Sequence, residues 1–227
     1  MDIFCKKTKL YFVPNFDNCK QKDRKYLLSI HILAGTIALL SAVFAICSEK
    51  GKRIHITAGR TYCLGMVFIF LTALPMSLIT DNIFLLLIAI FSFYLAFAGR
   101  RFAQNRKGIA SRIDWVAVGL MMLTGLGMWI LALFYYIENN SQYITLIILG
   151  FLSIVLGYAD YKTYKHQEAT GKKRIARHLT NMMGGTIAVV TAVLVVNVNI
   201  EPQWIFWLLP TLLITPIIAW WNWKVMK

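Results

Sequence analysis

Seven apolar stretches of about twenty residues each, separated by polar residues, run through this sequence. We place them at 26–47, 55–80, 82–98, 115–137, 143–164, 178–200 and 203–223. The hydrocarbon core of a bilayer is about 30 Å thick, and about 20 helical residues cross it. Of the 227 residues, 58% are hydrophobic and 15% are charged, whereas soluble domains average roughly 45–50% and 25%. The sequence therefore predicts an all-α integral membrane bundle of about seven transmembrane helices.

The chain divides into three parts by composition. Residues 1–25 form a basic N-terminal segment, residues 26–223 a single transmembrane helical domain, and residues 224–227 a short C-terminal tail. Asp81 and Asn82 alone divide the second apolar stretch from the third, which predicts a tight hairpin there. Pro75, Pro210 and Pro216 fall inside predicted spans, where proline bends helices.

The distribution of Lys and Arg predicts the orientation, because loops on the cytoplasmic side are enriched in them. Basic residues occur after the first, third and fifth stretches, and none occurs after the second, fourth and sixth. This contrast predicts a cytoplasmic C-terminus and an N-terminus on the opposite side. This orientation would place the basic residues of the N-terminal segment on the non-cytoplasmic side, against the same rule. They favour the alternative of an even number of spans with a cytoplasmic N-terminus.

The net charge of +14 would point to nucleic acid in a soluble protein. Here the basic residues lie beside the predicted spans, so we expect anionic lipid headgroups on the cytoplasmic side as partners and no nucleic acid. Several enzyme classes are disfavoured, since the chain has no Gly-rich phosphate loop, Cys-x-x-Cys or His-Glu-x-x-His motif. The sequence names no redox partner or solute, and a homo-oligomer stays open.

Small residues form stripes at helical spacing, as expected where membrane helices pack closely. The stripes are Gly35, Ala38, Ala42 and Ala45 in the first span, Gly150, Ser153 and Gly157 in the fifth, and Gly185, Ala188 and Ala192 in the sixth. Each stripe ends in polar residues on the same face: His31 in the first, Asp160 in the fifth, and Asn181 with His178 in the sixth.

The predicted topology brings several polar side chains to one depth near the cytoplasmic face. His55 and His178 begin two parallel spans, and Asp160 ends a span that runs toward the same side. Arg60 follows His55 by about a turn and a half, and Met182 follows His178 by about one turn. His31 lies by itself toward the other face, at a depth comparable to Met76 and Asn197.

Haem b in a helical bundle requires two axial ligands at matching depth on facing helices, with cations for its propionates. His55 and His178 meet the first requirement, and Arg60 or Arg177 could meet the second. Asp160 could accept a ring proton and fix the tautomer of one histidine.

Other uses of these residues stay open. Two histidines and a carboxylate could hold a non-haem metal, or the histidines could simply cap helix ends and bond headgroups. His31 could pair with Met76 at a second haem, relay protons, or make an interhelical hydrogen bond. Cys5 and Cys19 fall on the predicted outer side, where they could pair.

Three blocks of residues carry a resemblance to a known family. They are His31-x3-Gly35, Lys50-Gly51 with His55-x3-Gly59-Arg60-x-Tyr62, and His178-x3-Met182-x2-Gly185-x2-Ala188, followed by Thr191-Ala192, Asn197 and Trp207-x2-Pro210. In these the chain resembles a bacterial family of polytopic membrane proteins of uncharacterised function. The resemblance covers nearly all seven spans and implies a bacterial cytoplasmic (inner) membrane location, but no activity.

The placement of His55, His178 and His31 is also similar, more loosely, to the membrane b-type cytochromes of transmembrane ferric reductases, whose bundle histidines hold haem. Three span histidines allow at most one bis-histidine haem. The leading hypothesis is thus a multi-pass inner-membrane protein with one b-type haem for electron transfer or sensing. If it is an enzyme, it is a haem-dependent oxidoreductase.

The alternatives are a transporter-like bundle for a small solute or lipid, with His31, Asp160 and Asn181 lining a polar path, and a non-catalytic scaffold.

Overall fold

The computed structural model describes residues 16–198 and 200–227, and only the backbone of residues 16–24. The described residues form seven α-helices and no strand: α1 (Phe16–Cys47), α2 (Arg53–Ile79), α3 (Ile83–Gln104), α4 (Arg112–Ile137), α5 (Tyr143–Lys165), α6 (Gly171–Asn197) and α7 (Trp204–Met226). All seven are long and apolar enough to cross a membrane. The prediction of an all-α, seven-span membrane bundle is confirmed.

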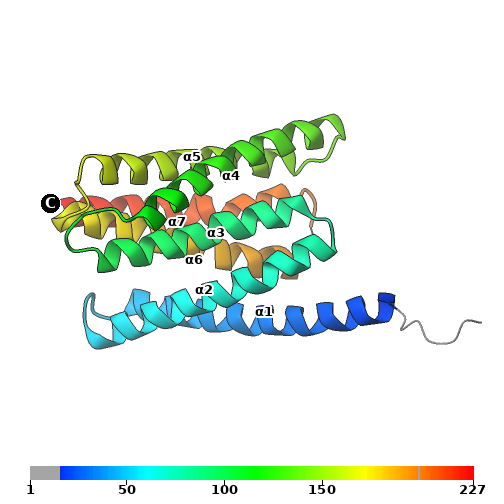
Figure 1. Ribbon diagram of the computed structural model, residues 1–227, viewed down its shortest axis with the longest axis horizontal. Coiled ribbons are helices and arrows are strands. Elements are labelled where there is room, and N and C mark those ends of the chain that lie inside the picture. Colours follow the sequence, from blue (N-terminus) through cyan, green and yellow to red (C-terminus); the bar gives the residue numbers. More distant parts are fainter. Residues whose placement is uncertain (1–15, 199) are drawn as a thin grey trace, which may run out of the picture.

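The helices run along one common direction (Figure 1). The α1–α2 hairpin forms one flank, the α4–α5 pair forms the other, and α3 and α6 lie between them, with α7 against α6. Most of α1 packs on α2 alone, so α2 and α3 separate α1 from the α4–α5 pair.

The turn between α2 and α3 is as tight as the sequence predicts. Asp81 adopts the left-handed conformation, with φ of 48°, which Asp tolerates better than most residues. The Asn82 side chain then accepts a hydrogen bond of 3.0 Å from the Leu85 amide, which caps the start of α3.

Three helix boundaries differ most from the predicted spans. α1 begins at Phe16 instead of residue 26, α3 continues to Gln104 instead of ending at residue 98, and α6 begins at Gly171 instead of residue 178. The added turns contain arginine and lysine, which favour helix although they end an apolar stretch. Hydropathy marks the membrane core, and the helices extend past it.

The predicted stripes of small residues lie at helix contacts, with one shift. In α1 the buried residues with described side chains are Ala34, Ala38, Ser41 and Ala42, whereas a methyl group at Gly35 would have open space around it. A methyl group at Gly65 of α2 would lie 3.0 Å from Cβ of Ala38. The close contact of α1 with α2 therefore uses a face one residue away from the Gly35 position.

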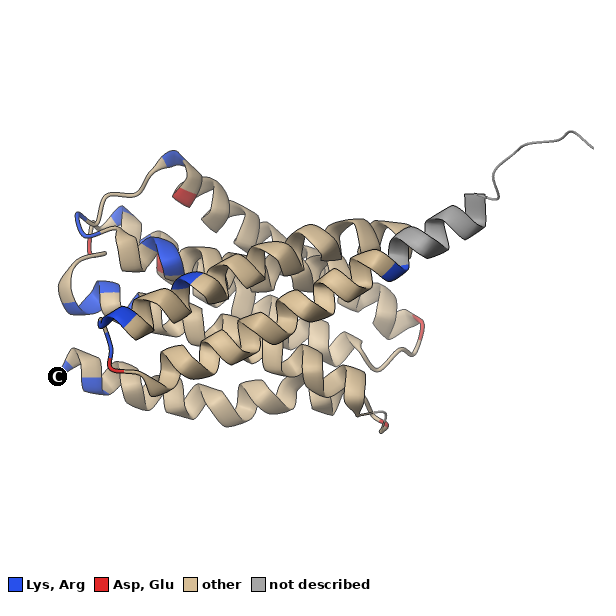
Figure 2. Cartoon of the chain, turned by 90° about the horizontal axis from the view of Figure 1, so that it is seen from below, with Lys and Arg blue, Asp and Glu red and all other residues tan. Residues whose placement is uncertain are grey.

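The charged residues are divided between the two ends of the bundle. Among residues 25–198 and 200–227, the Lys and Arg residues other than Lys25 gather toward the end that carries the C-terminus, whereas Asp81, Glu138 and Glu201 lie at the opposite end (Figure 2). We refer to these as the basic end and the acidic end. Cys5 and Cys19, whose pairing the sequence left open, lie outside the residues with described side chains.

Candidate functional site

His55 and His178 lie against each other at the basic end. His55 is in the first turn of α2, and His178 is in the second turn of α6. Their ring centroids are 6.3 Å apart, and the ring planes are nearly perpendicular, at 87°. Both side chains are half-buried. The structure thus brings together the two histidines that sequence analysis placed at one depth.

A backbone carbonyl fixes each of these rings. Nδ1 of His55 donates to the Ala45 carbonyl of α1 at 2.9 Å, and Nδ1 of His178 donates to the Gly99 carbonyl of α3 at 2.8 Å. A carbonyl only accepts, so Nδ1 carries the proton and Nε2 of the neutral ring keeps a lone pair.

Neither Nε2 has a hydrogen-bond partner among the described residues. This is the tautomer that metal-bound histidines adopt when their second nitrogen is held by a carbonyl. Sequence analysis gave that orienting role to Asp160, whereas the structure gives it to the two carbonyls.

The spacing of the rings matches that of two imidazoles on one metal ion. Metal–nitrogen bonds of about 2.0 Å place the centroids of two opposed imidazoles about 6 Å apart. The observed 6.3 Å is close to that separation, and the angle of 87° makes the contact edge to face.

Two glycines border the pair in different ways. A methyl group at Gly59, one turn after His55, would meet nothing within 4 Å, so this side of the histidine is open. A methyl group at Gly99 would lie 2.7 Å from Cγ and Sδ of Met182. Met182 is therefore next to the pair, as expected, but its thioether packs on the α3 backbone.

The two arginines expected to meet haem propionates do not face the pair. Arg60 is exposed, and five residues at about 100° each turn it about 140° around α2 from His55. Arg177 forms an ion pair with Asp160 instead.

The cations near the pair are ones that sequence analysis missed. Lys50 Nζ donates to the same Ala45 carbonyl as His55, at 3.1 Å. Arg174, one turn before His178, donates to the Phe102 and Ala103 carbonyls at 3.0 and 2.6 Å. Arg174 could have been found from the sequence, because residues four apart lie on the same face of a helix. The position of Lys50 could not, because it depends on how the α1–α2 loop folds.

Asp160 belongs to a separate, buried network. Its Oδ2 accepts from the Tyr94 hydroxyl at 2.7 Å, and its Oδ1 accepts from Nε of Arg177 at 2.7 Å. Nδ2 of Asn181 donates to Oδ2 at 3.1 Å. The network joins α3, α5 and α6, and because Arg177 precedes His178 it fixes the rotation of α6 at the histidine pair.

His31 lies away from both clusters. Its Nδ1 donates to Oγ1 of Thr72 at 2.9 Å, and that hydroxyl donates to the Phe68 carbonyl at 2.7 Å. The bond joins α1 to α2, which is the interhelical hydrogen bond considered above. Asn197 bonds its own helix, at the Val193 carbonyl. The structure therefore does not join His31 to Asp160 and Asn181 in one polar path.

No group of three or more His, Cys, Asp or Glu residues that could hold a metal ion occurs in the described part of the chain. Among the described residues, then, no carboxylate groups with His55 and His178, and Asp160 lies in its own network with Tyr94, Arg177 and Asn181.

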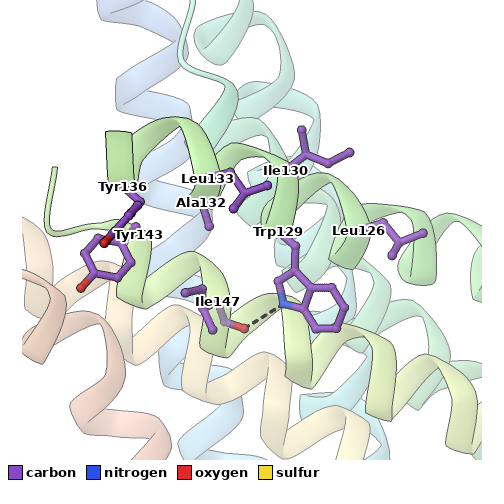
Figure 3. Close-up of a pocket in the computed structure, with 8 residues that line it drawn as sticks. All are labelled: Leu126, Trp129, Ile130, Ala132, Leu133, Tyr136, Tyr143 and Ile147. Atoms are coloured by element: carbon purple, nitrogen blue, oxygen red, sulfur yellow. Dashed lines mark hydrogen bonds between the residues drawn. The ribbon is translucent and has the colours of Figure 1, made fainter. Parts of the chain in front are cut away.

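An apolar groove lies elsewhere, between α4 and α5 toward the acidic end. It has a volume of about 630 Å³ and an apolar lining in which the Trp129 indole donates to the Ile147 carbonyl at 3.1 Å (Figure 3). It contains no charged side chain. We assign it no chemistry.

Comparison with known proteins adds no relative: no family model, curated protein or solved structure matches this chain. The fold alone therefore defines the class, which is a multi-pass membrane protein of seven apolar helices.

Proposed function

We propose that this membrane protein binds one b-type haem at its basic end, with His55 and His178 as axial ligands. The observation that carries the proposal is the geometry of the pair. Two rings on different helices have centroids 6.3 Å apart, each has its Nδ1 bonded to a carbonyl, and neither Nε2 has a hydrogen bond with a described residue.

The donor set favours haem over a bare metal ion. Among the described residues, the protein supplies two imidazole nitrogens at this place and no group with a third ligand, and a porphyrin would supply four nitrogens itself. Lys50 and Arg174 are the cations available for the propionates.

Two histidine ligands would also limit the kind of reaction that the haem could support. When bound, the haem would supply one-electron redox chemistry. If His55 and His178 both held the haem iron, no position would remain there for a substrate, which would favour electron transfer or sensing over oxygen activation. Any enzymatic activity would be that of a haem-dependent membrane oxidoreductase.

We place the protein in a bacterial cytoplasmic (inner) membrane, with the basic end and the C-terminus in the cytoplasm. The gathering of Lys and Arg at one end supports this orientation. The family resemblance of the sequence supports the bacterial location, and anionic headgroups are the lipid partners that this end would attract.

The test is the absorption spectrum of detergent-purified protein produced with haem supplied, oxidised and then reduced with dithionite. We expect a Soret band and sharp reduced bands that are lost in His55→Ala and His178→Ala. His166→Ala is the matched control, because His166 caps the end of α5 away from the pair, and it should keep the spectrum.

A second variant separates loss of a ligand from loss of fold. His178→Met should retain haem with a shifted spectrum and a raised reduction potential, because His–Met ligation raises the potential. A colourless wild-type protein that elutes as a single folded species would overturn the proposal.

A further inference from the structure

A second groove, with a volume of about 370 Å³, lies between α1 and α2 toward the basic end. Its lining includes the apolar side chains of Phe44, Ile54 and Ala58 and the hydroxyl groups of Ser41 and Thr57. Arg53, the first residue of α2, also lines it. This groove therefore combines a cationic end with an apolar wall. The α4–α5 groove has an apolar lining but no charged side chain.

The positive charge at this groove has no internal partner. Arg53 and Arg60 are both exposed, and neither forms a hydrogen bond or ion pair within the described part of the chain. Glu49, the acidic residue of the adjoining loop, already pairs with Lys52 at 3.7 Å. Seven residues place Arg53 and Arg60 on nearly the same side of α2.

The side-chain hydroxyls of Ser41 and Thr57 are also without a hydrogen bond among the described residues. The polar part of the groove thus offers donors from Arg53 and the two hydroxyls and contains no carboxylate. An anion with several acceptor oxygens matches this set, and arginine is well suited to phosphate.

The depth of Arg60 indicates where the anion comes from. Arg60 lies about 10 Å along a membrane-spanning helix from its first residue. An arginine that faces lipid at that depth is costly unless its head reaches the interface or pairs with an anion there. Lipid phosphates lie at that interface, and acyl chains continue past the apolar wall.

We infer that the α1–α2 groove binds one anionic glycerophospholipid from the leaflet at the basic end. Its phosphate contacts Arg53 and is attracted by Arg60, and one acyl chain lies along Phe44, Ile54 and Ala58. This site is independent of the proposed haem, because Arg53 and Arg60 point away from His55 around α2.

The experiment measures lipid binding to the full chain by native mass spectrometry in detergent. Phosphatidylglycerol and phosphatidylcholine of equal chain length are titrated separately. We expect the wild type to prefer phosphatidylglycerol. The variant Arg53→Gln/Arg60→Gln should weaken phosphatidylglycerol binding about tenfold or more, with phosphatidylcholine little changed.

Matched controls separate a site from bulk attraction. Arg106→Gln/Lys107→Gln removes the same charge from the exposed α3–α4 loop at the same end and should keep the preference. Ala58→Trp fills the groove without a change of charge and should lower binding, whereas Leu133→Trp, in the α4–α5 groove, should not.

Three outcomes would overturn the inference. An equal loss in the loop double variant would indicate non-specific attraction, and an unchanged preference in Arg53→Gln/Arg60→Gln would place the lipid elsewhere. Displacement of bound phosphatidylglycerol by millimolar inorganic phosphate would identify a site for the free anion instead.

Discussion

At the scale of single residues, polar groups inside the bundle are held by partners on other helices. The Ala45 carbonyl lies in the last turn of α1, where carbonyls lack a helical partner, and His55 and Lys50 both donate to it. Asp160 likewise accepts from side chains of α3 and α6. These bonds fix the ring orientation of His55 and the rotation of α6.

Removal of Asp160 should strongly destabilise the fold, because it leaves the Arg177 guanidinium largely buried without a counter-charge. We expect Asp160→Leu to lower the free energy of unfolding by about 3–5 kcal/mol. Reversible denaturation in mixed detergent measures this free energy, and the thermal aggregation midpoint of the purified protein should fall with it.

Replacement of both partners should cost less. Asp160→Leu/Arg177→Met should recover part of the lost stability, because two apolar side chains can replace a buried ion pair, whereas the Tyr94 hydroxyl and the Asn181 amide still lose their acceptor. Glu49→Gln removes an exposed pair and should change the midpoint little. A single variant Asp160→Leu as stable as Glu49→Gln would contradict a stabilising role for the network.

At the scale of helices, the contacts depend on residues small enough for close approach. A methyl group at Gly125 of α4 would lie 2.8 Å from the Gly150 carbonyl of α5. The Ser153 hydroxyl donates to the Met121 carbonyl at 2.7 Å across the same interface. The backbones of α4 and α5 therefore approach each other closely, as in other small-residue membrane contacts.

Two glycines of α4, Gly125 at the contact with α5 and Gly119 on an open face, should differ in how much an added methyl group destabilises the protein. Gly125→Ala should lower stability by about 1–3 kcal/mol, because the Gly150 backbone would have to shift. Gly119→Ala lies on the same helix, where a methyl group would meet nothing within 4 Å, and it should have no such cost. Denaturation in mixed detergent compares the two variants, and equal midpoints would contradict the close contact.

At the scale of the whole molecule, seven antiparallel spans place the described loops alternately at the two ends. The loops at residues 48–52 and 105–111 lie at the basic end, and the loop at residues 138–142 lies at the acidic end. Because the loops alternate, the location of one loop at each end of the bundle is enough to establish the orientation of the whole protein in the membrane.

Labelling with a membrane-impermeant maleimide in intact cells should answer it. In a background with the four cysteines replaced by serine, Asn139→Cys should react from outside. Lys107→Cys should react only after permeabilisation, because basic loops stay in the cytoplasm. The reverse pattern would invert the proposed orientation.

The sequence by itself determined the class of fold. Apolar length and the placement of Asp81–Asn82 predicted seven spans and the tight α2–α3 turn, because bilayer thickness dictates helix length. It also predicted that His55 and His178 would share one depth, since depth follows from position along a span.

Only the tertiary structure decided how each helix is rotated and which groups face each other. In the folded bundle, Arg60 lies on a different side of α2 from His55, and Arg177 pairs with Asp160. Lys50 and Arg174 lie near the histidine pair. Position along a helix is set by local sequence, whereas rotation about its axis is set by packing against all neighbouring helices at once. The partners of a buried side chain therefore follow from the assembled bundle.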